Sequence, residues 1–184
     1  MRYAYLAGIG IGAILVAAIA VAAPMARAVP SWAVVDAASA TEQNDNVTNL
    51  TIDASDDIPR RTSVAPDAVA GFAFADLETG KVLVATIHPT FRDSAQNPDS
   101  WHLHAAQLAA GENGHDFCID SFFPNPTGGI SIQGDQMSIN VRNSVMPFTV
   151  AEIDGAVGFV VNPEAACGGT GLAVDVTDEP VGLS

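Results

Sequence analysis

The chain has 184 residues, a length that suits one domain with additional terminal segments. It carries 21 acidic residues against 7 lysines and arginines, which gives a formal net charge of −14. Proteins bind phosphate groups mainly through lysine and arginine, so a chain this acidic is a poor match for nucleic acid or for an anionic membrane surface. We expect neither as a partner.

The first 28 residues have the features of a secretory signal peptide. Arg2 is positively charged, residues 5–23 are apolar or glycine, and residues 26–28 (Ala-Arg-Ala) fit the small-x-small pattern before a cleavage site. We predict cleavage after residue 28, which leaves 5 cations against 21 acids, a charge of about −16. The alternative is an uncleaved membrane anchor, because crossing a bilayer takes roughly 20 apolar residues. In both cases the remainder is predicted to be secreted or held at the cell surface, with an unknown extracellular partner.

Residues 29–69 are predicted to form a disordered acidic linker. Their central part, residues 38–68, is polar, acidic and free of aromatic residues. Such a segment buries too little apolar surface to offset the entropy of ordering. Two Asn-x-Thr sequons lie within it, so Asn46 and Asn49 are predicted glycosylation sites.

From Gly71 onward the apolar residues recur with a period of two, which is typical of strands. The stretch GFAFADLETGKVLVATIH predicts a hairpin with a two-residue loop at Thr79-Gly80, in which Phe72 faces Ile87. The large apolar side chains of this hairpin then share one face: Phe72, Phe74, Leu83 and Ile87.

The stretch ISIQGDQMSINV predicts a second hairpin that turns at Gly134-Asp135, with Ile132 opposite Met137 and Ile130 opposite Ile139. Further strands are expected at 101–109, 115–122, 148–152, 156–161 and 171–176. Short strands at this spacing predict an all-β domain over residues 70–178, either a β-sandwich or a Greek-key barrel, and we favour an antiparallel β-sandwich of the Greek-key type. Residues 179–184 are expected to form a C-terminal tail.

The chain contains two cysteines, Cys118 and Cys167. In an exported protein an even pair favours a disulfide, which here would close a loop of about 49 residues and stabilise the fold by about 4 kcal/mol. Two free thiols or two metal ligands are the alternative.

The stretch SWHLHAAQ places two histidines, His102 and His104, on one face of a strand, roughly 6.5–7 Å apart. If this strand pairs with the preceding one so that His88 lies opposite His102, three imidazoles converge, and the pattern predicts a Cu or Zn site formed by His88, His102 and His104. A shift of one residue in the pairing would separate them. The alternative is three histidines on a solvated strand face without a metal. His115 is expected to lie about 20 Å along the strand from His104.

The segment from GFAFADLETGKVLVATIH to WHLHAAQL resembles the secreted CHRD domain, and the resemblance extends over roughly residues 70–177. It implies a sandwich related to the copper/zinc superoxide dismutases, in which a His-x-His strand supplies metal ligands and a disulfide ties a loop to the sandwich. His102 and His104 match the His-x-His pair, and Cys118 and Cys167 match the bridge.

The sequence contains no phosphate-binding glycine loop, no Gly-x-Ser-x-Gly nucleophile motif and no EF-hand loop. We therefore predict no catalytic residues and favour an exported binding or structural module that binds Cu or Zn through its histidines. Two alternatives stay open at this point. One is a copper-dependent redox enzyme of the superoxide dismutase type, and the other is a metal-free adhesive or structural surface domain.

Overall fold

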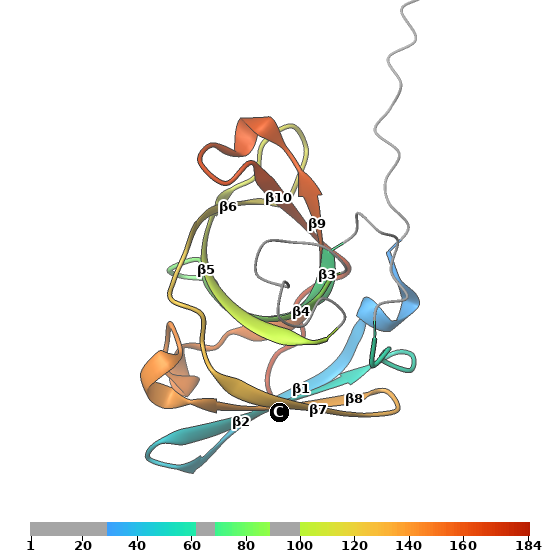
Figure 1. Cartoon of the computed structure of the whole chain (residues 1–184), viewed down its shortest axis with the longest axis vertical. Coiled ribbons are helices and arrows are strands. Elements are labelled where there is room, and N and C mark those ends of the chain that lie inside the picture. The colour runs from blue at the N-terminus through green and yellow to red at the C-terminus, as the bar shows by residue number, and fades with distance from the viewer. Residues whose placement is uncertain (1–28, 62–68, 89–99) are drawn as a thin grey trace, which may run out of the picture.

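A computed structural model of the chain describes residues 29–61, 69–88 and 100–184. They form an all-β fold in which all pairs of named strands are antiparallel, as expected from the alternating apolar pattern. The strands form two sheets, and one of them closes into a barrel (Figure 1). The closed barrel corresponds to the alternative named for the strand spacing, whereas the favoured prediction was a sandwich. The predicted signal peptide, residues 1–28, lies outside the described residues.

The barrel has six strands. Around the barrel they follow the order β10 (Leu172–Val176), β6 (Phe117–Phe122), β5 (His102–Ala110), β4 (Lys81–Ile87), β3 (Val69–Asp76) and β9 (Gly155–Pro163), and β9 pairs back to β10. The separate sheet has the order β1 (Val35–Asn44), β2 (Val47–Ala54), β8 (Gln136–Arg142) and β7 (Gly128–Gln133). Figure 1 looks along the barrel, with the four-stranded sheet lying against one side of it.

Two apolar cores result from this arrangement. The first lies between the four-stranded sheet and the outer face of the barrel, and its largest fully buried side chains include Leu50, Ile52, Met137, Ile139, Phe72, Phe74, Leu83 and Ile87. The second lies inside the barrel and contains Ala73, Ala75, Val82, Ala106, Ile119, Val157, Phe159, Val161 and Val174. Strand β3 serves both cores because alternate residues point to opposite faces, with Phe72 and Phe74 outward and Ala73 and Ala75 inward.

The predicted linker over residues 29–69 is wrong for most of its described part. Strands β1 and β2 form a hairpin there, and β2 pairs along its length with β8. In β2 every second residue is buried, including Leu50 and Ile52, which lie opposite Ile139 and Met137. The apolar alternation is short and diluted by acidic and amide residues, and one of the two partner strands of β2, β8, lies about ninety residues later. The average composition therefore hides it.

The N-terminal residues before β1 are also ordered. A short 3₁₀ helix, η1 (Ser31–Ala33), places the Trp32 ring against Phe72 and Trp101, with ring centroids 5.9 and 5.6 Å away. Phe72 and Trp101 are themselves stacked at 5.9 Å. This aromatic cluster attaches the start of the described chain to the outside of the barrel, next to the beginning of β5.

The register of the first hairpin differs from the prediction by two residues. Phe72 pairs with Ala85 instead of Ile87, because the turn has four residues, 77–80, where two were predicted. The Asp76 carboxylate explains the longer turn, since it accepts hydrogen bonds from the backbone N–H groups of Glu78 and Thr79 and from the Thr79 hydroxyl. A shift of two keeps every side chain on its predicted face, so the predicted apolar face is confirmed.

The second hairpin has the predicted register, with Ile132 opposite Met137 and Ile130 opposite Ile139. The strand predicted at 148–152 is wrong, because this stretch contains the 3₁₀ helix η3 (Val150–Glu152). There the Glu152 carboxylate accepts hydrogen bonds from the backbone N–H and the hydroxyl of Thr149, which start a helical turn. Two further 3₁₀ helices are η2 (Asn143–Val145) and η4 (Ala165–Cys167).

The predicted C-terminal tail, residues 179–184, is attached to both sheets. Val181 pairs with Ala156 of β9, and Leu183 forms a parallel bridge with Ala38 of β1. The backbone of Val181 both donates to and accepts from Ala156, at 2.8 and 2.9 Å. The last residues therefore link the barrel to the four-stranded sheet.

Candidate metal centre

Two adjacent barrel strands bring three histidines together. His88 directly follows β4, and His102 begins β5. In the ladder between these strands Thr86 lies opposite His102 and Val84 opposite His104. Because alternate residues share a face, His88, His102 and His104 project on the same side of the strands. His88 and His104 line the barrel's cavity, and His102 lines a neighbouring hollow on the surface.

The three imidazoles are close enough to share one metal ion. The ring centroids of His88 and His102 are 4.7 Å apart, those of His102 and His104 are 4.9 Å apart, and those of His88 and His104 are 6.5 Å apart. One ring nitrogen from each lies within 4.8 Å of the other two. Two nitrogens bound to one ion are separated by at most about 4.2 Å, since metal–nitrogen bonds are about 2.0–2.1 Å long. Small side-chain rotations therefore suffice to close the site.

Hydrogen bonds orient two of the three rings. Nδ1 of His102 lies 2.9 Å from the backbone oxygen of Ser100, and Nδ1 of His104 lies 3.2 Å from the side-chain oxygen of Asn125. Both oxygens are carbonyl acceptors, so each Nδ1 carries the hydrogen and donates it. In a neutral ring this leaves Nε2 with the lone pair that a metal requires. Metal-binding histidines are commonly held by such hydrogen bonds.

The surroundings limit how far the rings can move. The His88 side chain is 3% exposed, and His102 and His104 are half-buried. The residue before His102 is anchored, because the Trp101 indole N–H donates to the backbone oxygen of Pro59 at 2.7 Å and its ring stacks on Phe72. The start of β5 is therefore held against the barrel.

The donor set determines what this cluster can do. Three neutral imidazoles suit borderline transition metals, whereas Mg²⁺ and Ca²⁺ prefer oxygen ligands. It is the one group of three or more potential ligand side chains at such distances within the described ranges. The histidine cluster, His88, His102 and His104, could therefore hold a transition-metal ion.

No family model, curated protein or solved structure matches this chain. Its function is therefore inferred from the sequence and from the geometry of the histidine cluster. Among the described residues, no helix is long and apolar enough to cross a membrane.

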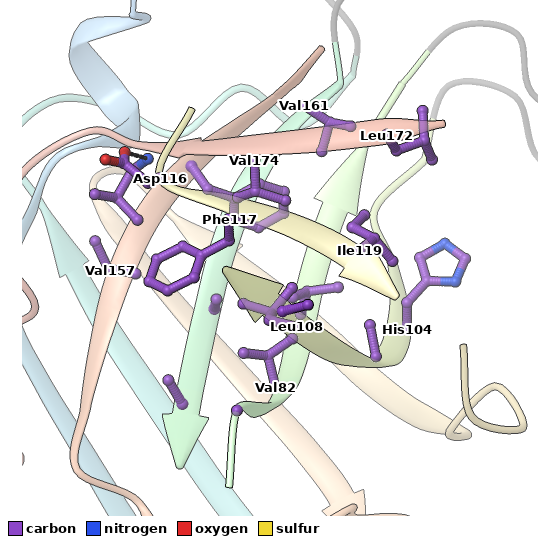
Figure 2. A pocket seen from close by; sticks show the side chains of 18 of the residues that line it. Val82, His104, Leu108, Asp116, Phe117, Ile119, Val157, Val161, Leu172 and Val174 are labelled. Carbon is purple, nitrogen blue, oxygen red and sulfur yellow. Dashed lines mark hydrogen bonds between the residues drawn. The ribbon is translucent and has the colours of Figure 1, made fainter. Parts of the chain in front are cut away.

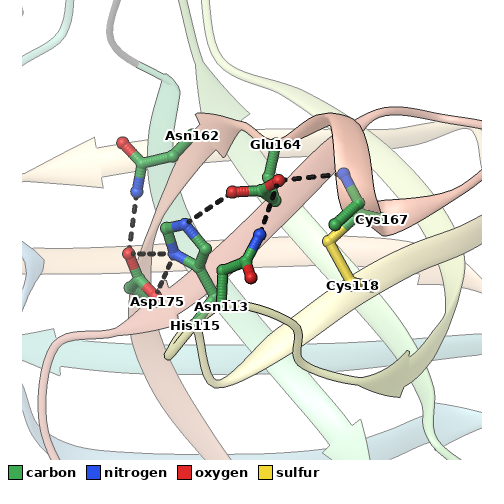
Figure 3. A network of polar contacts seen from close by, with 8 residues as sticks. Asn113, His115, Cys118, Asn162, Glu164, Cys167 and Asp175 are labelled. Atoms are coloured by element: carbon green, nitrogen blue, oxygen red, sulfur yellow. Dashed lines mark hydrogen bonds and ion pairs between the residues drawn. A yellow bond between two sulfur atoms is a disulfide. The ribbon is translucent and has the colours of Figure 1, made fainter. Parts of the chain in front are cut away.

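The fourth histidine, His115, belongs to a separate polar network (Figure 3). Its Nδ1 lies 2.9 and 3.0 Å from the two carboxylate oxygens of Asp175, and its Nε2 lies 3.7 Å from Glu164. The pKa of Glu164 is below its usual value, chiefly because its carboxylate accepts a hydrogen bond from the Ala166 backbone N–H, with smaller contributions from Asn113 and His115. This network connects the loop before β6 to β10.

The predicted disulfide between Cys118 and Cys167 is present, next to this network (Figure 3). It joins β6 to η4 across 49 residues of sequence, and both half-cystines are buried against Ala173. Disulfides persist in oxidising compartments, so the bond fits a location outside the cytoplasm.

The two predicted glycosylation sites lie in different surroundings. Asn46 is exposed in the turn between β1 and β2. Asn49 is half-buried within β2, and its side-chain amide donates to Ser138 at 2.8 Å and to Asn140 at 3.2 Å. The structure therefore places Asn46 where an enzyme could reach it and gives the Asn49 amide partners within the sheet.

All three histidines were predictable from the sequence, whereas the groups that orient their rings were not. Ser100 and Asn125 have no spacing relationship to a metal motif, and Asn125 comes near His104 only through the loop between β6 and β7. The one local signal in the sequence was a polar residue two positions before a predicted ligand. Ser100 has this position relative to His102, and Asn125 has no such signal.

Proposed function

We propose that this protein is an exported β-module that binds Cu or Zn through His88, His102 and His104. The observation that carries the proposal is the approach of three imidazole nitrogens to within 4.8 Å of one another. The backbone oxygen of Ser100 and the amide oxygen of Asn125 support it, because each holds an imidazole in the tautomer that leaves Nε2 for a metal.

Copper and zinc fit the donor set best. Imidazole suits Zn, Cu, Ni and Fe, and among divalent ions Cu²⁺ binds nitrogen ligands most tightly. A strongly acidic chain also attracts cations, since its formal charge is −14. When bound, the ion would supply Lewis acidity or, as copper, electron transfer. The three histidines would hold the ion, and the side chains around them would limit access of water.

Export is part of the proposal. It is supported by the N-terminal signal pattern and by the disulfide between Cys118 and Cys167. We also propose a distant relationship to the secreted CHRD domains and their Greek-key sandwich. An antiparallel all-β fold, a His-x-His strand and a single disulfide support this relationship.

A second function, a copper-dependent redox enzyme, is favoured by one feature of the site. Three protein ligands leave a further coordination position free, as catalytic metal sites do. Two of the ligands, His88 and His104, line the barrel's cavity, so a small molecule in the cavity could approach the ion. Steady turnover of a small oxygen species by the copper-loaded protein would establish this function. If the copper-loaded protein shows no turnover, the redox function is refuted and metal binding without catalysis is the function that remains.

Metal analysis of the purified protein tests the main proposal. Wild type loaded with Cu²⁺ or Zn²⁺ and then desalted is expected to retain about one ion per chain, whereas His102→Ala with His104→Ala retains none. His115→Ala is the matched control, because this histidine lies in the separate network, and it should retain the ion. Equal retention by all three proteins would refute the site and favour a metal-free structural or adhesive domain.

A further inference from the structure

The interior of the barrel contains a cavity of about 1010 Å³. Six-stranded barrels are narrow, and barrels of about eight strands are usually filled by their side chains. Here several inward-facing positions hold small residues, including Ala73, Ala75 and Ala106, so the interior is only partly filled. This volume lies at the upper end of the range that proteins use to bind small molecules.

The cavity runs from one end of the barrel to the other. Its lining includes the Asp76–Gly80 turn at one end and His88 and His104 at the other. Strand β4 connects these ends, and its seven residues span about 20 Å. In Figure 2, His104 and Asp116 lie at opposite ends of the cavity, and the labelled side chains between them are apolar. The shape suits an elongated molecule.

The chemistry of the lining selects against charged ligands. Most lining residues are valine, leucine, isoleucine, phenylalanine or alanine. Asp76, Glu78 and Asp116 line it near one end, and neither lysine nor arginine occurs among the described residues that line it. Among the described lining residues an anion would meet carboxylates and no lysine or arginine, and a buried cation would lose hydration along an apolar wall. A neutral molecule avoids both costs.

Apolar side chains also mark both ends of the cavity. Leu77 is 55% exposed in the turn after β3, and Phe122 is 51% exposed at the end of β6. Both line the cavity, and the Phe122 ring lies 6.0 Å from the His104 ring between centroids. Exposed large apolar residues on a soluble surface often belong to binding sites.

We propose that the barrel interior binds one neutral, elongated apolar molecule, such as a long-chain alcohol, with its polar end toward His88, His104 and Asn125. These side chains, together with Thr86, supply the hydrogen-bonding groups at that end of the lining. The site goes beyond the proposed metal centre and does not depend on it, because the apolar walls come from strands that carry no histidine as well as from β5.

The test uses the neutral dye Nile red with the metal-free protein, prepared with EDTA. Wild type is expected to bind one dye per chain with increased fluorescence. Ala106→Leu and Ala73→Leu place extra carbon atoms inside the barrel from two different strands and should each weaken dye binding at least tenfold. Ala151→Leu adds the same atoms at an exposed position outside the cavity and should bind like wild type.

Thermal unfolding of the same variants separates a filled cavity from a damaged fold. Leucine side chains that enter empty space gain packing contacts, so the melting temperature should stay constant or rise. Equal dye binding by wild type and both cavity variants would overturn the proposal, because it would place the dye on the outer surface. No binding to wild type would overturn it as well.

A competition experiment on the wild-type protein identifies the class of ligand. It needs no variant, so it remains valid even if both cavity variants misfold. At pH 8, 1-dodecanol should displace Nile red at least tenfold more effectively than dodecanoate. Equal displacement by the two would refute a site for neutral molecules, and displacement by neither would refute the site itself. Dye binding is measured on the metal-free protein, whereas the test of the metal centre measures retained Cu²⁺ or Zn²⁺, so a failure of the metal site is distinguishable from a failure of the cavity site.

Discussion

The Nδ1 atom of His104 donates a hydrogen bond to the side-chain oxygen of Asn125, at 3.2 Å, across the loop that follows β6. Such contacts fix the orientation of a metal-binding ring, and their loss typically weakens metal affinity 10–100-fold. Asn125 is not one of the three proposed metal ligands, so we expect it to influence metal binding only through its hydrogen bond to His104. Its effect on affinity therefore reports the orientation of His104.

Asn125→Ala is expected to weaken Cu²⁺ or Zn²⁺ binding about 10–100-fold without abolishing it. Competition with a chromophoric chelator measures the dissociation constant, and circular dichroism checks the fold. Asn113→Ala is the matched control, because Asn113 donates to Glu164 in the separate network around His115. If the two variants bind metal equally well, Asn125 does not orient a metal ligand.

The convergence of the histidines was predictable because strand pairing tolerates an error of two residues. The sequence predicts His88 opposite His102, whereas Thr86 occupies that position. A shift of two moves a side chain along the strand and keeps it on the same face, while a shift of one would have turned it to the other face. The longer turn of the first hairpin changed its register by two in the same way, with no change of face.

Barrel closure and the first two strands were not predictable in the same way. Closure requires β3 to pair with β9, about eighty to ninety residues later, and β9 to pair with β10. Strands buried on both faces, such as β3, also lack the apolar–polar alternation that would show which face points inward. Strand β2 shows the alternation, but an acidic surrounding sequence and a distant partner, β8, conceal it.

The turn at Asp76 predicts a specific dependence of stability on pH. The pKa of Asp76 is held below its usual value, first by the hydrogen bond from the Thr79 hydroxyl and further by the backbone N–H groups of Thr79 and Glu78. A carboxyl whose pKa is lower in the folded than in the unfolded state stabilises the fold above its unfolded pKa, about 3.9. This stabilisation is lost as the pH falls through the lowered folded pKa.

Asp76→Asn should therefore lower the melting temperature by a constant amount between about pH 5 and 8, and the difference from wild type should shrink below about pH 4. Melting temperatures measured across this range test the expectation. Asp178→Asn makes the same chemical change at an exposed carboxyl outside the turn. A difference between wild type and Asp76→Asn that persists unchanged at pH 2–3 would show that the charge of Asp76 is not responsible.

Removing the disulfide should destabilise the fold without dismantling the histidine cluster. The bond between Cys118 and Cys167 closes a 49-residue loop, for which chain entropy gives about 4 kcal/mol. Cys118→Ala with Cys167→Ala is expected to lower the free energy of unfolding by about 2–5 kcal/mol in urea titrations. Wild type in reducing agent should behave like the double variant, and no change in either would mean that the loop is already ordered in the unfolded ensemble.

The contact between η1 and β9 gives a sharper test of how the first residues attach to the barrel. A side chain at Gly158 would place its Cβ 1.5 Å from the backbone oxygen of Ala33 and 2.6 Å from the Thr177 hydroxyl. That hydroxyl donates to the same Ala33 oxygen at 2.6 Å, so the three groups are already in close contact. Alanine at this position must displace η1, and Trp32 moves with it.

Gly158→Ala is expected to cost about 1–3 kcal/mol of unfolding free energy or more, as overpacking of a dense contact does. A red shift of tryptophan fluorescence should accompany the loss, because Trp32 is buried against Phe72 and Trp101 only while η1 is docked. Gly169→Ala is the control, since a Cβ there meets no atom within 4 Å. If the two variants unfold alike and keep the wild-type fluorescence, η1 does not pack closely on β9, and the aromatic support next to His102 would have to come from elsewhere.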